Sequence, residues 1–184
     1  MPPEVKSSGT GRRAVFLDRD GVINRAAVSN GKPYPPASAD ALEILPGVAD
    51  ALQRLKNAGF LLIVVTNQPD VARGTITRDV VEKIHTRLAN ALPIDRFVVC
   101  YHDAVDHCDC RKPQPGMLLA SAKDLQIDLA GSYMVGDRWR DVEAGRRAGC
   151  RTFFVDYGYK EEQPRDYDFR VASLAEAATV ILKR

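Results

Sequence analysis

Short apolar runs alternate along this chain with segments in which apolar residues recur every three or four positions. An apolar run of three to six residues closed by a polar cluster is typical of a strand buried on both faces of a parallel sheet. The longer segments have the spacing of amphipathic helices, and two of them end at a glycine. We therefore expect strands near residues 14–17, 60–65, 97–99, 133–135 and 152–155, and helices near 47–58, 77–92, 115–125, 142–148 and 172–182.

This alternation predicts an α/β fold: a Rossmann-like three-layer sandwich with a parallel sheet, whose strands are joined by right-handed connections. A chain of 184 residues is long enough for one domain with a sizeable core, which we place at residues 14–184. The polar stretch 1–13 is expected to be a flexible tail. The stretch 25–40, rich in Pro, Ser and Gly, is expected to be a loop that faces the substrate as a flap.

Composition and charge argue against several functional classes. A net charge of +2 is too small to favour nucleic acid or an anionic membrane as partner, and no apolar run approaches the ~20 residues of a membrane span. The N-terminus lacks the apolar segment of a secretory signal. We therefore expect a cytoplasmic protein that acts as a monomer on a small molecule.

Polar side chains follow the ends of the predicted strands. Asp18 and Asp20 follow the first strand, Thr66 the second, Lys112 the third and Asp137 the fourth. Because the carboxyl ends of parallel strands meet at one edge of a sheet, these groups should converge there. Carboxylates suit Mg²⁺, while a lysine and a hydroxyl stabilise charge on phosphoryl oxygens. One carboxylate can attack phosphorus and the other can exchange protons, so the pattern favours phosphoryl transfer.

A second cluster lies between residues 100 and 110, where three of the four cysteines occur. Cys100 with His102, and Cys108 with Cys110, form two pairs of soft ligands that can close a tetrahedral Zn²⁺ site. His107 is the alternative to His102 as a ligand. Four protein ligands leave no open position for water, so we expect a structural zinc. It would hold in place the loop that carries the basic residues directly after Cys110.

Four stretches resemble, in order, the motifs of the haloacid dehalogenase superfamily of phosphatases: FLDRDGV, VVTNQ, the lysine of CRKP, and VGDRWRD. This resemblance covers about residues 14–156 and implies a fold of haloacid dehalogenase type. It implies Asp18 as nucleophile and Asp20 as general acid and base, with Thr66 and Lys112 as stabilisers of the phosphoryl group. The implied ligands of Mg²⁺ are Asp18, Asp20 through its backbone carbonyl, and Asp137, with Asp141 in the outer shell.

The pattern CxH…CDCRKPxPGML further resembles the zinc-containing phosphatases with a minimal cap, which act on heptose bisphosphates or on histidinol phosphate. The five-residue gap between His102 and Cys108 is nearer the histidinol-phosphate enzymes, whereas PGML is nearer the heptose enzymes. The resemblance implies removal of the 7-phosphate from a heptose 1,7-bisphosphate through an aspartyl-phosphate, for nucleotide-heptose synthesis. Histidinol phosphate, or another small sugar phosphate, is the alternative substrate. An alternative interpretation from a different functional class is a zinc-stabilised binding module without catalytic activity. Against it, none of the residues implied in catalysis is missing from the sequence.

Residues beside these motifs are candidates for contact with the substrate. They are Asn67, Gln68, Arg73 and Arg111, with Lys32 and Tyr34 in the flap, and the two arginines are the candidates for a second phosphate. By contrast, His85 is expected at the surface of its helix. The cluster of Arg138, Arg140, Arg146 and Arg147 is expected on a solvated helix face.

Overall fold

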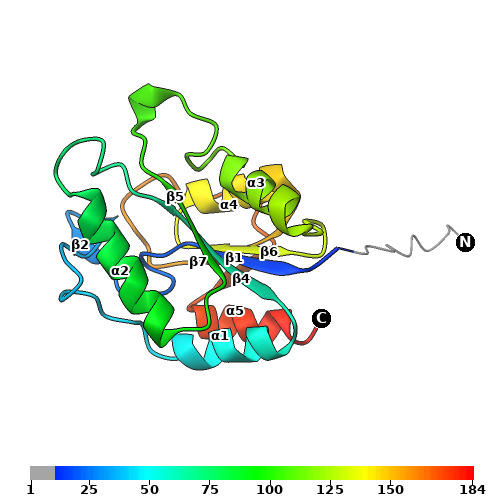
Figure 1. Cartoon of the computed structure of the whole chain (residues 1–184). Coiled ribbons are helices and arrows are strands. Elements are labelled where there is room, and N and C mark those ends of the chain that lie inside the picture. Colours follow the sequence, from blue (N-terminus) through cyan, green and yellow to red (C-terminus); the bar gives the residue numbers. More distant parts are fainter. Residues whose placement is uncertain (1–10) are drawn as a thin grey trace, which may run out of the picture.

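The structure is a computed structural model that describes residues 11–184 (Figure 1). Its central parallel sheet contains β1 (Ala14–Leu17), β4 (Leu61–Asn67), β5 (Arg96–Cys100), β6 (Tyr133–Gly136), β7 (Arg151–Val155) and β8 (Phe169–Val171), in the spatial order β5-β4-β1-β6-β7-β8. The helices are α1 (Val48–Asn57), α2 (Arg78–Ala91), α3 (Gly116–Leu125), α4 (Trp139–Ala148) and α5 (Leu174–Ile181). The predicted Rossmann-like sandwich with a parallel sheet is therefore confirmed.

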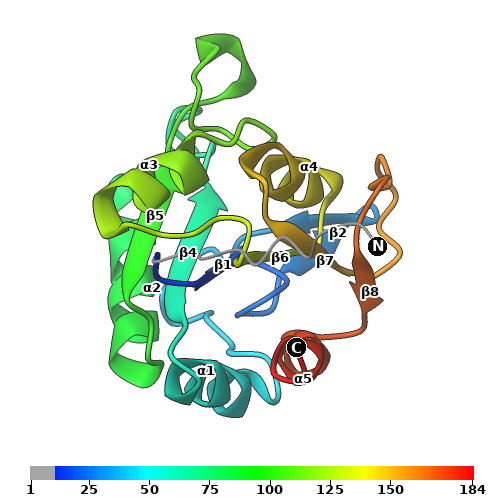
Figure 2. The ribbon, with the colours of Figure 1, turned by 90° about the vertical axis from the view of Figure 1, so that its right-hand side faces the viewer.

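Alternation along the central strand divides the core into two layers. Val15 and Leu17 of β1 pack with the apolar faces of α1, α2 and α5, while Ala14 and Phe16 pack with α3 and α4. All four side chains are fully buried, as expected for a strand covered on both faces. Figure 2 shows α1 and α5 below the sheet and α3 and α4 above it. The apolar run that predicted this strand thus contributes to both layers of the sandwich.

The predicted helices and strands lie close to the observed ones, with α4 beginning three residues earlier than expected. Its start is fixed by Asp141, whose side chain accepts a hydrogen bond of 3.0 Å from the backbone N–H of Arg138. The short edge strand β8 was not predicted. Of the expected tail at 1–13, residues 1–10 lie outside the described range, while Arg12 pairs with Ile127 and Arg13 lies over the ring of Phe60.

The expected loop at 25–40 contains an antiparallel hairpin of β2 (Ala27–Ser29) and β3 (Lys32–Tyr34). Its turn is formed by Asn30 and Gly31, which have φ values of 52° and 77°. Both residues are therefore in the left-handed region, as a tight hairpin turn of the primed type requires. This hairpin is the only regular structure inserted between β1 and α1 in the described chain, which agrees with a minimal cap.

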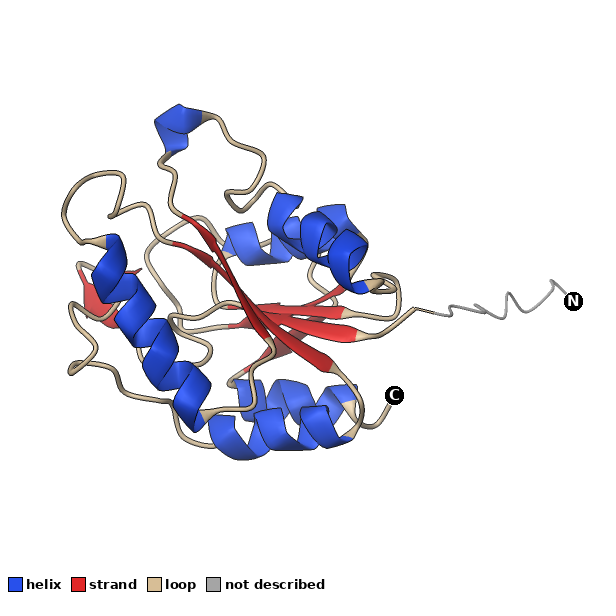
Figure 3. Ribbon diagram, viewed as in Figure 1, coloured by secondary structure: helices blue, strands red, loops and turns tan. Residues whose placement is uncertain are grey.

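The loops that follow the strands gather at the carboxyl edge of the sheet. Figure 3 shows the β2–β3 hairpin on the left and the loop with a single 3₁₀ turn, η1 (Ala104–Asp106), at the top.

Within residues 11–184, no helix combines the length and the apolar character needed to cross a bilayer.

Candidate active site

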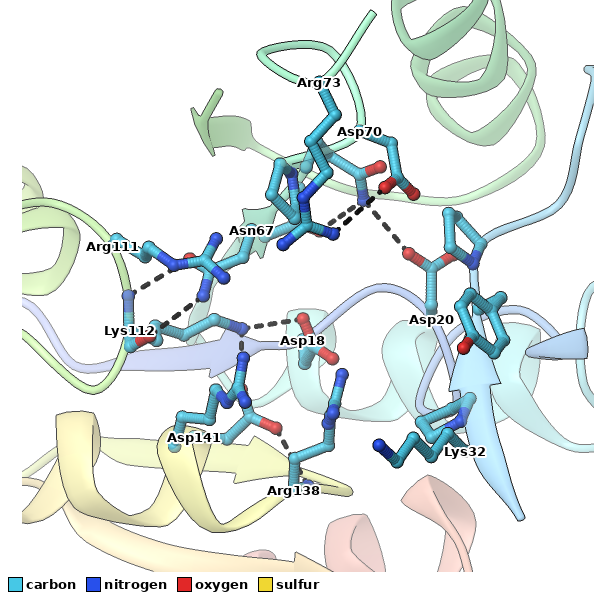
Figure 4. A pocket seen from close by; sticks show the side chains of 17 residues that line it. Asp18, Asp20, Lys32, Asn67, Asp70, Arg73, Arg111, Lys112, Arg138 and Asp141 are labelled. Carbon is cyan, nitrogen blue, oxygen red and sulfur yellow. Dashed lines mark hydrogen bonds and ion pairs between the residues drawn. The ribbon is translucent and has the colours of Figure 1, made fainter. Parts of the chain in front are cut away.

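The residues predicted at the strand ends come from neighbouring strands. Asp18 directly follows β1, which lies between β4, the strand of Thr66, and β6, the strand before Asp137. Lys112 reaches the same edge from the loop after β5. Figure 4 shows its side chain pointing toward Asp18, with Asp141 below the ammonium group. The sheet order therefore brings the predicted group together, although the residues are far apart in the sequence.

Lys112 is at the centre of this group. Its Nζ lies 2.7 Å from Asp18 Oδ1, 2.6 Å from Asp141 Oδ1 and 2.8 Å from the carbonyl oxygen of Val65. Burial lowers the pKa of Lys112, but the carboxylates of Asp141 and Asp18 outweigh that effect, so the pKa is raised above its usual value. The lysine is therefore a permanently charged cation, fixed by three oxygen partners inside the site.

Three buried carboxylates gather here, and Lys112 pairs with two of them, Asp18 and Asp141. One oxygen each of Asp18, Asp137 and Asp141 lie within 4.8 Å of one another. Burial, and next to it the charge of Asp141, raise the pKa of Asp18 to about 6, although Lys112 opposes the shift. Burial and the charge of Asp18 also raise the pKa of Asp137 well above its usual value. The group thus carries more negative charge than its protein partners balance.

The oxygen atoms of this group fit a hard divalent cation. Asp137 Oδ1 is buried and has no hydrogen-bond partner among the described residues, while its Oδ2 accepts from the hydroxyl of Tyr159 at 2.9 Å. A buried, unpartnered carboxylate oxygen is costly unless a cation contacts it. Both oxygens of Asp141, in contrast, have partners, in the ammonium of Lys112 and the N–H of Arg138. The donor set therefore suits Mg²⁺ on Asp18 and Asp137, with Asp141 in an outer position.

A glycine permits the close approach of two of these segments. Gly21 has a φ of 88°, and a Cβ atom at that position would lie 1.9 Å from Asp137 Oδ2. Any side chain here would displace Asp137 or the turn that follows Asp20. The DRDG sequence after β1 therefore needs its glycine for the geometry of the carboxylate group.

The carboxylate of Asp20 is separate from that group and is held by amide and guanidinium donors. Arg19 donates to its two oxygens at 3.1 and 3.0 Å, Asn24 donates at 2.9 Å, and Gln68 donates at 3.0 Å. Gln68 Nε2 also lies 2.9 Å from Thr66 Oγ1. Figure 4 shows Asp20 across the cavity from Lys112. Asp20 is therefore fixed in orientation beside Asp18.

Two of the predicted substrate contacts also hold the site together. Gln68 orients Asp20 and Thr66, as described. Asn67 bonds twice to the backbone of Lys112, since its Nδ2 donates to the carbonyl at 3.0 Å and its Oδ1 accepts from the N–H at 3.1 Å. Both side chains line the cavity, so a supporting role and contact with a ligand are compatible.

The predicted zinc ligands also come together. The three sulfur atoms of Cys100, Cys108 and Cys110 are 3.1 to 3.7 Å apart, and His102 Nδ1 lies 3.3 Å from Cys110 Sγ. Tetrahedral Zn–S bonds of about 2.3 Å place sulfur atoms about 3.8 Å apart, close to this arrangement. His107 lies outside the group formed by the described residues, which leaves His102 as the histidine of the site. The cluster therefore fits Zn²⁺ with four protein ligands.

A cavity of about 310 Å³ opens in front of the carboxylates. Its lining includes residues from the β2–β3 hairpin, from the loop after β4, and Arg111 and Lys112, which directly follow the zinc loop (residues 100–110). It is rich in cations: Lys32, Arg73, Arg111, Lys112, Arg138 and Arg140. Figure 4 shows the labelled members of this set, Lys32, Arg73, Arg111, Lys112 and Arg138, spread around the cavity. The site therefore has an anionic centre and a cationic rim.

Acidic partners hold part of this rim in place. Arg73 donates to both oxygens of Asp103 at 2.7 Å, which joins the loop after β4 to the zinc loop, and it also contacts Asp70. Arg138 pairs with Glu161. Arg111 donates to the carbonyl of His102 at 3.1 Å. These contacts fix the side chains in position while leaving them on the cavity wall.

Arg140 differs from the other arginines of the rim. Its Nε is buried and has no hydrogen-bond partner within residues 11–184. Burial, followed by the charges of Arg138 and Arg111, lowers its pKa below the usual value of arginine. The prediction of a solvated helix face is wrong for Arg138 and Arg140, because both line the cavity, whereas Arg146 and Arg147 are exposed as expected. Arg140 is therefore a cation that needs a negative partner.

Two further side chains at the site escaped the sequence analysis. His85 is not at the surface: it is 4% exposed, and its Nε2 lies 3.0 Å from Arg19 Nη1, so the prediction for this residue is wrong. Tyr159 follows β7 and reaches Asp137 across the site. The spacing of His85 four residues after Val81, which is fully buried on α2, was a usable signal. No motif pointed to Tyr159.

Comparison with known proteins gives concordant results. A HAD-hydrolase-like family model matches residues 109–179. D-glycero-beta-D-manno-heptose-1,7-bisphosphate 7-phosphatase from Salmonella typhi is 40% identical over 186 aligned residues, covering 93% of this chain and 96% of the relative. The enzyme of the same name from Escherichia coli strain K12 is 42% identical over 151 residues, covering 76% of each chain.

A solved structure extends this similarity to the fold. It is that of D,D-heptose 1,7-bisphosphate phosphatase from B. bronchiseptica, complexed with magnesium and phosphate. The TM-score is 0.76 at 32% sequence identity, and the alignment covers 93% of this chain and 98% of the other. The similarity in fold therefore extends over nearly the whole of this chain.

Proposed function

The chain belongs to the family of D-glycero-D-manno-heptose-1,7-bisphosphate 7-phosphatases, within the haloacid dehalogenase-like hydrolases, and from this membership we propose that it removes the 7-phosphate of a heptose 1,7-bisphosphate. The observation that carries the proposal is the pairing of an anionic centre, suited to Mg²⁺ and a phosphoryl group, with a cationic rim in one cavity. The sequence relatives are named for the β-anomer, so we propose the same anomer here.

In the proposed reaction the carboxylate of Asp18 attacks phosphorus while the bond between phosphorus and O7 of the sugar breaks. Asp20 gives its proton to O7, so that the sugar leaves as an alcohol. Asp20 then takes a proton from water, whose oxygen attacks phosphorus and releases phosphate and the Asp18 carboxylate. Thr66 and Lys112 hold the phosphoryl oxygens throughout, because the hydroxyl and the ammonium border the cavity beside Asp18.

Mg²⁺ would be held by Asp18, Asp137 and the backbone carbonyl of Asp20. When bound, it supplies positive charge that offsets the carboxylates and the phosphoryl oxygens. The unpartnered Oδ1 of Asp137 and the raised pKa values of Asp18 and Asp137 support this assignment. Asp141 helps to keep Lys112 in place through a second ion pair of 2.6 Å.

The cationic rim supports a substrate with a second phosphate. The 7-phosphate occupies the carboxylate end of the cavity, so the 1-phosphate would lie toward the rim. Arg111 and Arg140 are the candidates for its ligands. The buried Nε of Arg140 has no hydrogen-bond partner among residues 11–184, and Arg111 contacts a backbone carbonyl and lies 3.9 Å from the carboxylate of Asp103. Arg73, the other predicted contact, would act beside them from its pair with Asp103.

The proposed zinc has a structural role. Cys110 is followed directly by Arg111 and Lys112, so an ion held by Cys100, His102, Cys108 and Cys110 would fix the start of the segment that delivers both cations. The four ligand atoms leave no open position for water. A monomeric state and a cytoplasmic location stay predictions from the sequence.

Phosphate release in the presence of Mg²⁺ tests this function. The substrates are the two anomers of heptose 1,7-bisphosphate and histidinol phosphate, and Asp18→Asn is the blank. A preference of several orders of magnitude in kcat/KM for the β-anomer supports the proposal. Comparable turnover of histidinol phosphate would transfer the assignment to that substrate. No release from any of them, with the fold intact, would favour a binding module.

A further inference from the structure

Arg19, between the two aspartates of the first motif, is the largest fully buried side chain of the described residues. Its guanidinium makes contacts along two edges. Nε and Nη2 donate to the carboxylate of Asp20 at 3.1 and 3.0 Å, and Nη1 lies 3.0 Å from Nε2 of His85 on α2. A buried cation of this kind is tolerated only when its donors are satisfied.

His85 is suited to this contact in position and in chemistry. Its ring stacks on Phe97 of β5, with 4.7 Å between the ring centroids and 21° between the planes. Arginine can only donate, so Nε2 must be the unprotonated acceptor nitrogen of a neutral imidazole. Burial, and next the charge of Arg19, lower the pKa of His85 to about 4, which keeps the ring neutral near pH 7.

We propose that His85 is a positioning residue for proton transfer, acting through Arg19 on Asp20. The imidazole fixes the far edge of the guanidinium, and the near edge then holds the carboxylate of Asp20 toward the cavity. Asn24 and Gln68 hold the same carboxylate from other directions. The inference rests on the proposed function, because it assumes that Asp20 protonates the leaving alcohol.

Leaving groups of different basicity reveal this role. A sugar alcohol needs a proton as it leaves, whereas nitrophenolate leaves without one. The ratio kcat/KM reports the steps up to transfer of the phosphoryl group to Asp18, so it reports the departure of the leaving group. A general acid contributes on the order of 10²–10⁴-fold to such a step. Loss of its positioning should therefore lower the rate with an alkyl phosphate selectively.

The test compares His85→Phe and His85→Gln on the heptose bisphosphate and on p-nitrophenyl phosphate. Phenylalanine keeps a ring against Phe97 but has no acceptor, whereas glutamine restores an acceptor near the position of Nε2. His85→Phe should lower kcat/KM about tenfold or more for the sugar phosphate and less than about threefold for p-nitrophenyl phosphate. His85→Gln should recover most of the loss.

Leu88→Ala is the matched control, because Leu88 is fully buried one turn further along α2 and is not part of the Arg19 contacts. It should lower stability and affect both substrates equally. An equal loss on both substrates in His85→Phe, or no recovery in His85→Gln, would overturn the proposal. Asp20→Asn separates the role of His85 from the role of Asp20 as general acid. If Asp20→Asn also lowers kcat/KM equally for both substrates, the role of Asp20 itself is wrong.

Discussion

Asn67 at the end of β4 and Lys112 in the loop after β5 are joined by two hydrogen bonds between the amide side chain of the first and the backbone of the second. The ammonium group of Lys112 meanwhile bonds to the carbonyl of Val65 on the same strand. The lysine that faces Asp18 is thus fixed to β4 at both its backbone and its side chain. The zinc cluster ends only two residues before this lysine, at Cys110.

Replacement of Asn67 by alanine should therefore displace Lys112. The loss of two partly buried hydrogen bonds is expected to lower the free energy of unfolding by about 1–3 kcal/mol. It should also lower kcat, because the cation would no longer be held against the phosphoryl oxygens. Urea unfolding and steady-state kinetics measure the two effects. Asn57→Ala, at the exposed end of α1, is the control, and an unaltered kcat in Asn67→Ala would show that Lys112 does not need this support.

Tyr159 is expected to support the binding of Mg²⁺ through Asp137. The hydroxyl donates to Oδ2 and leaves Oδ1 free, which orients the carboxylate. Loss of such a supporting contact typically weakens metal binding by on the order of 10–100-fold. Tyr159→Phe should raise the Mg²⁺ concentration for half-maximal activity and leave the KM for the sugar phosphate nearly unchanged. Tyr157→Phe is the control, because the ring of Tyr157 stacks on that of Tyr159. An equal rise in the required Mg²⁺ concentration in both variants would contradict the assignment.

Zinc content and stability should fall together when one ligand of the zinc cluster is removed. Cys108→Ser is expected to lose most of its zinc, to unfold at a lower temperature and to lose activity, because Arg111 and Lys112 follow the cluster directly. Cys150→Ser is the control, since Cys150 is buried outside the cluster. Elemental analysis and thermal unfolding provide the measurements. Full zinc occupancy in Cys108→Ser would remove this residue from the ligand set.

His85 should make the protein sensitive to mild acid. Its folded-state pKa of about 4 is below the usual 6.5, so the unfolded state binds the proton more readily. The stability that His85 contributes is therefore complete above pH 6.5 and is lost as the pH falls toward 4. Glu82 and Asp20 favour the protonated ring, but burial and Arg19 outweigh them.

Urea unfolding near pH 7.5 and near pH 5 measures this effect. The free energy of unfolding should fall by about 2 kcal/mol more in the parent protein than in His85→Gln, which has no titrating group at that position. Equal losses in both proteins would show that another group causes the acid sensitivity.

The sequence predicted most of the fold because the spacing of its apolar residues matches the faces of the strands and helices that are buried in the structure. β1 is apolar at every position and is covered on both faces, and the apolar face of α2 appears at regular spacing. The β2–β3 hairpin was missed although Asn30-Gly31 is a strong signal for such a turn, because the surrounding prolines suggested an irregular loop. The edge strand β8 has three residues, too few for a period to show.

The candidate site was predictable where strand order alone brings residues together. Asp18, Thr66 and Asp137 lie at the carboxyl ends of neighbouring strands, and a parallel sheet must place them at one edge. The burial of individual charged or polar side chains, in contrast, could not be predicted from the sequence. Arg19 and Arg140 each stand directly before an aspartate in the sequence. In the structure, however, Arg19 is buried against Asp20 and His85, whereas Arg140 lines the cavity. That difference arises from contacts between distant segments, which no local pattern encodes.

Arg140 gives the most direct test of the second phosphate. The guanidinium borders the cavity, its Nε has no hydrogen-bond partner in the described part of the chain, and the charges of Arg138 and Arg111 lie close to it. A phosphate would relieve that repulsion and would accept a charge-assisted hydrogen bond, worth about 1.5–3 kcal/mol. Arg140→Gln should therefore lower kcat/KM for the heptose 1,7-bisphosphate by about tenfold to a hundredfold. Heptose 7-phosphate, which lacks the 1-phosphate, should show almost no change.

Arg146→Gln is the matched control, because Arg146 lies on the same helix, is exposed and pairs with Glu143. It should leave both substrates unaffected. An equal loss with the monophosphate and the bisphosphate in Arg140→Gln would mean that Arg140 acts on the shared 7-phosphate or on the helix itself. A loss confined to the bisphosphate would place the second phosphate at the cationic rim, because only that substrate presents an anion there.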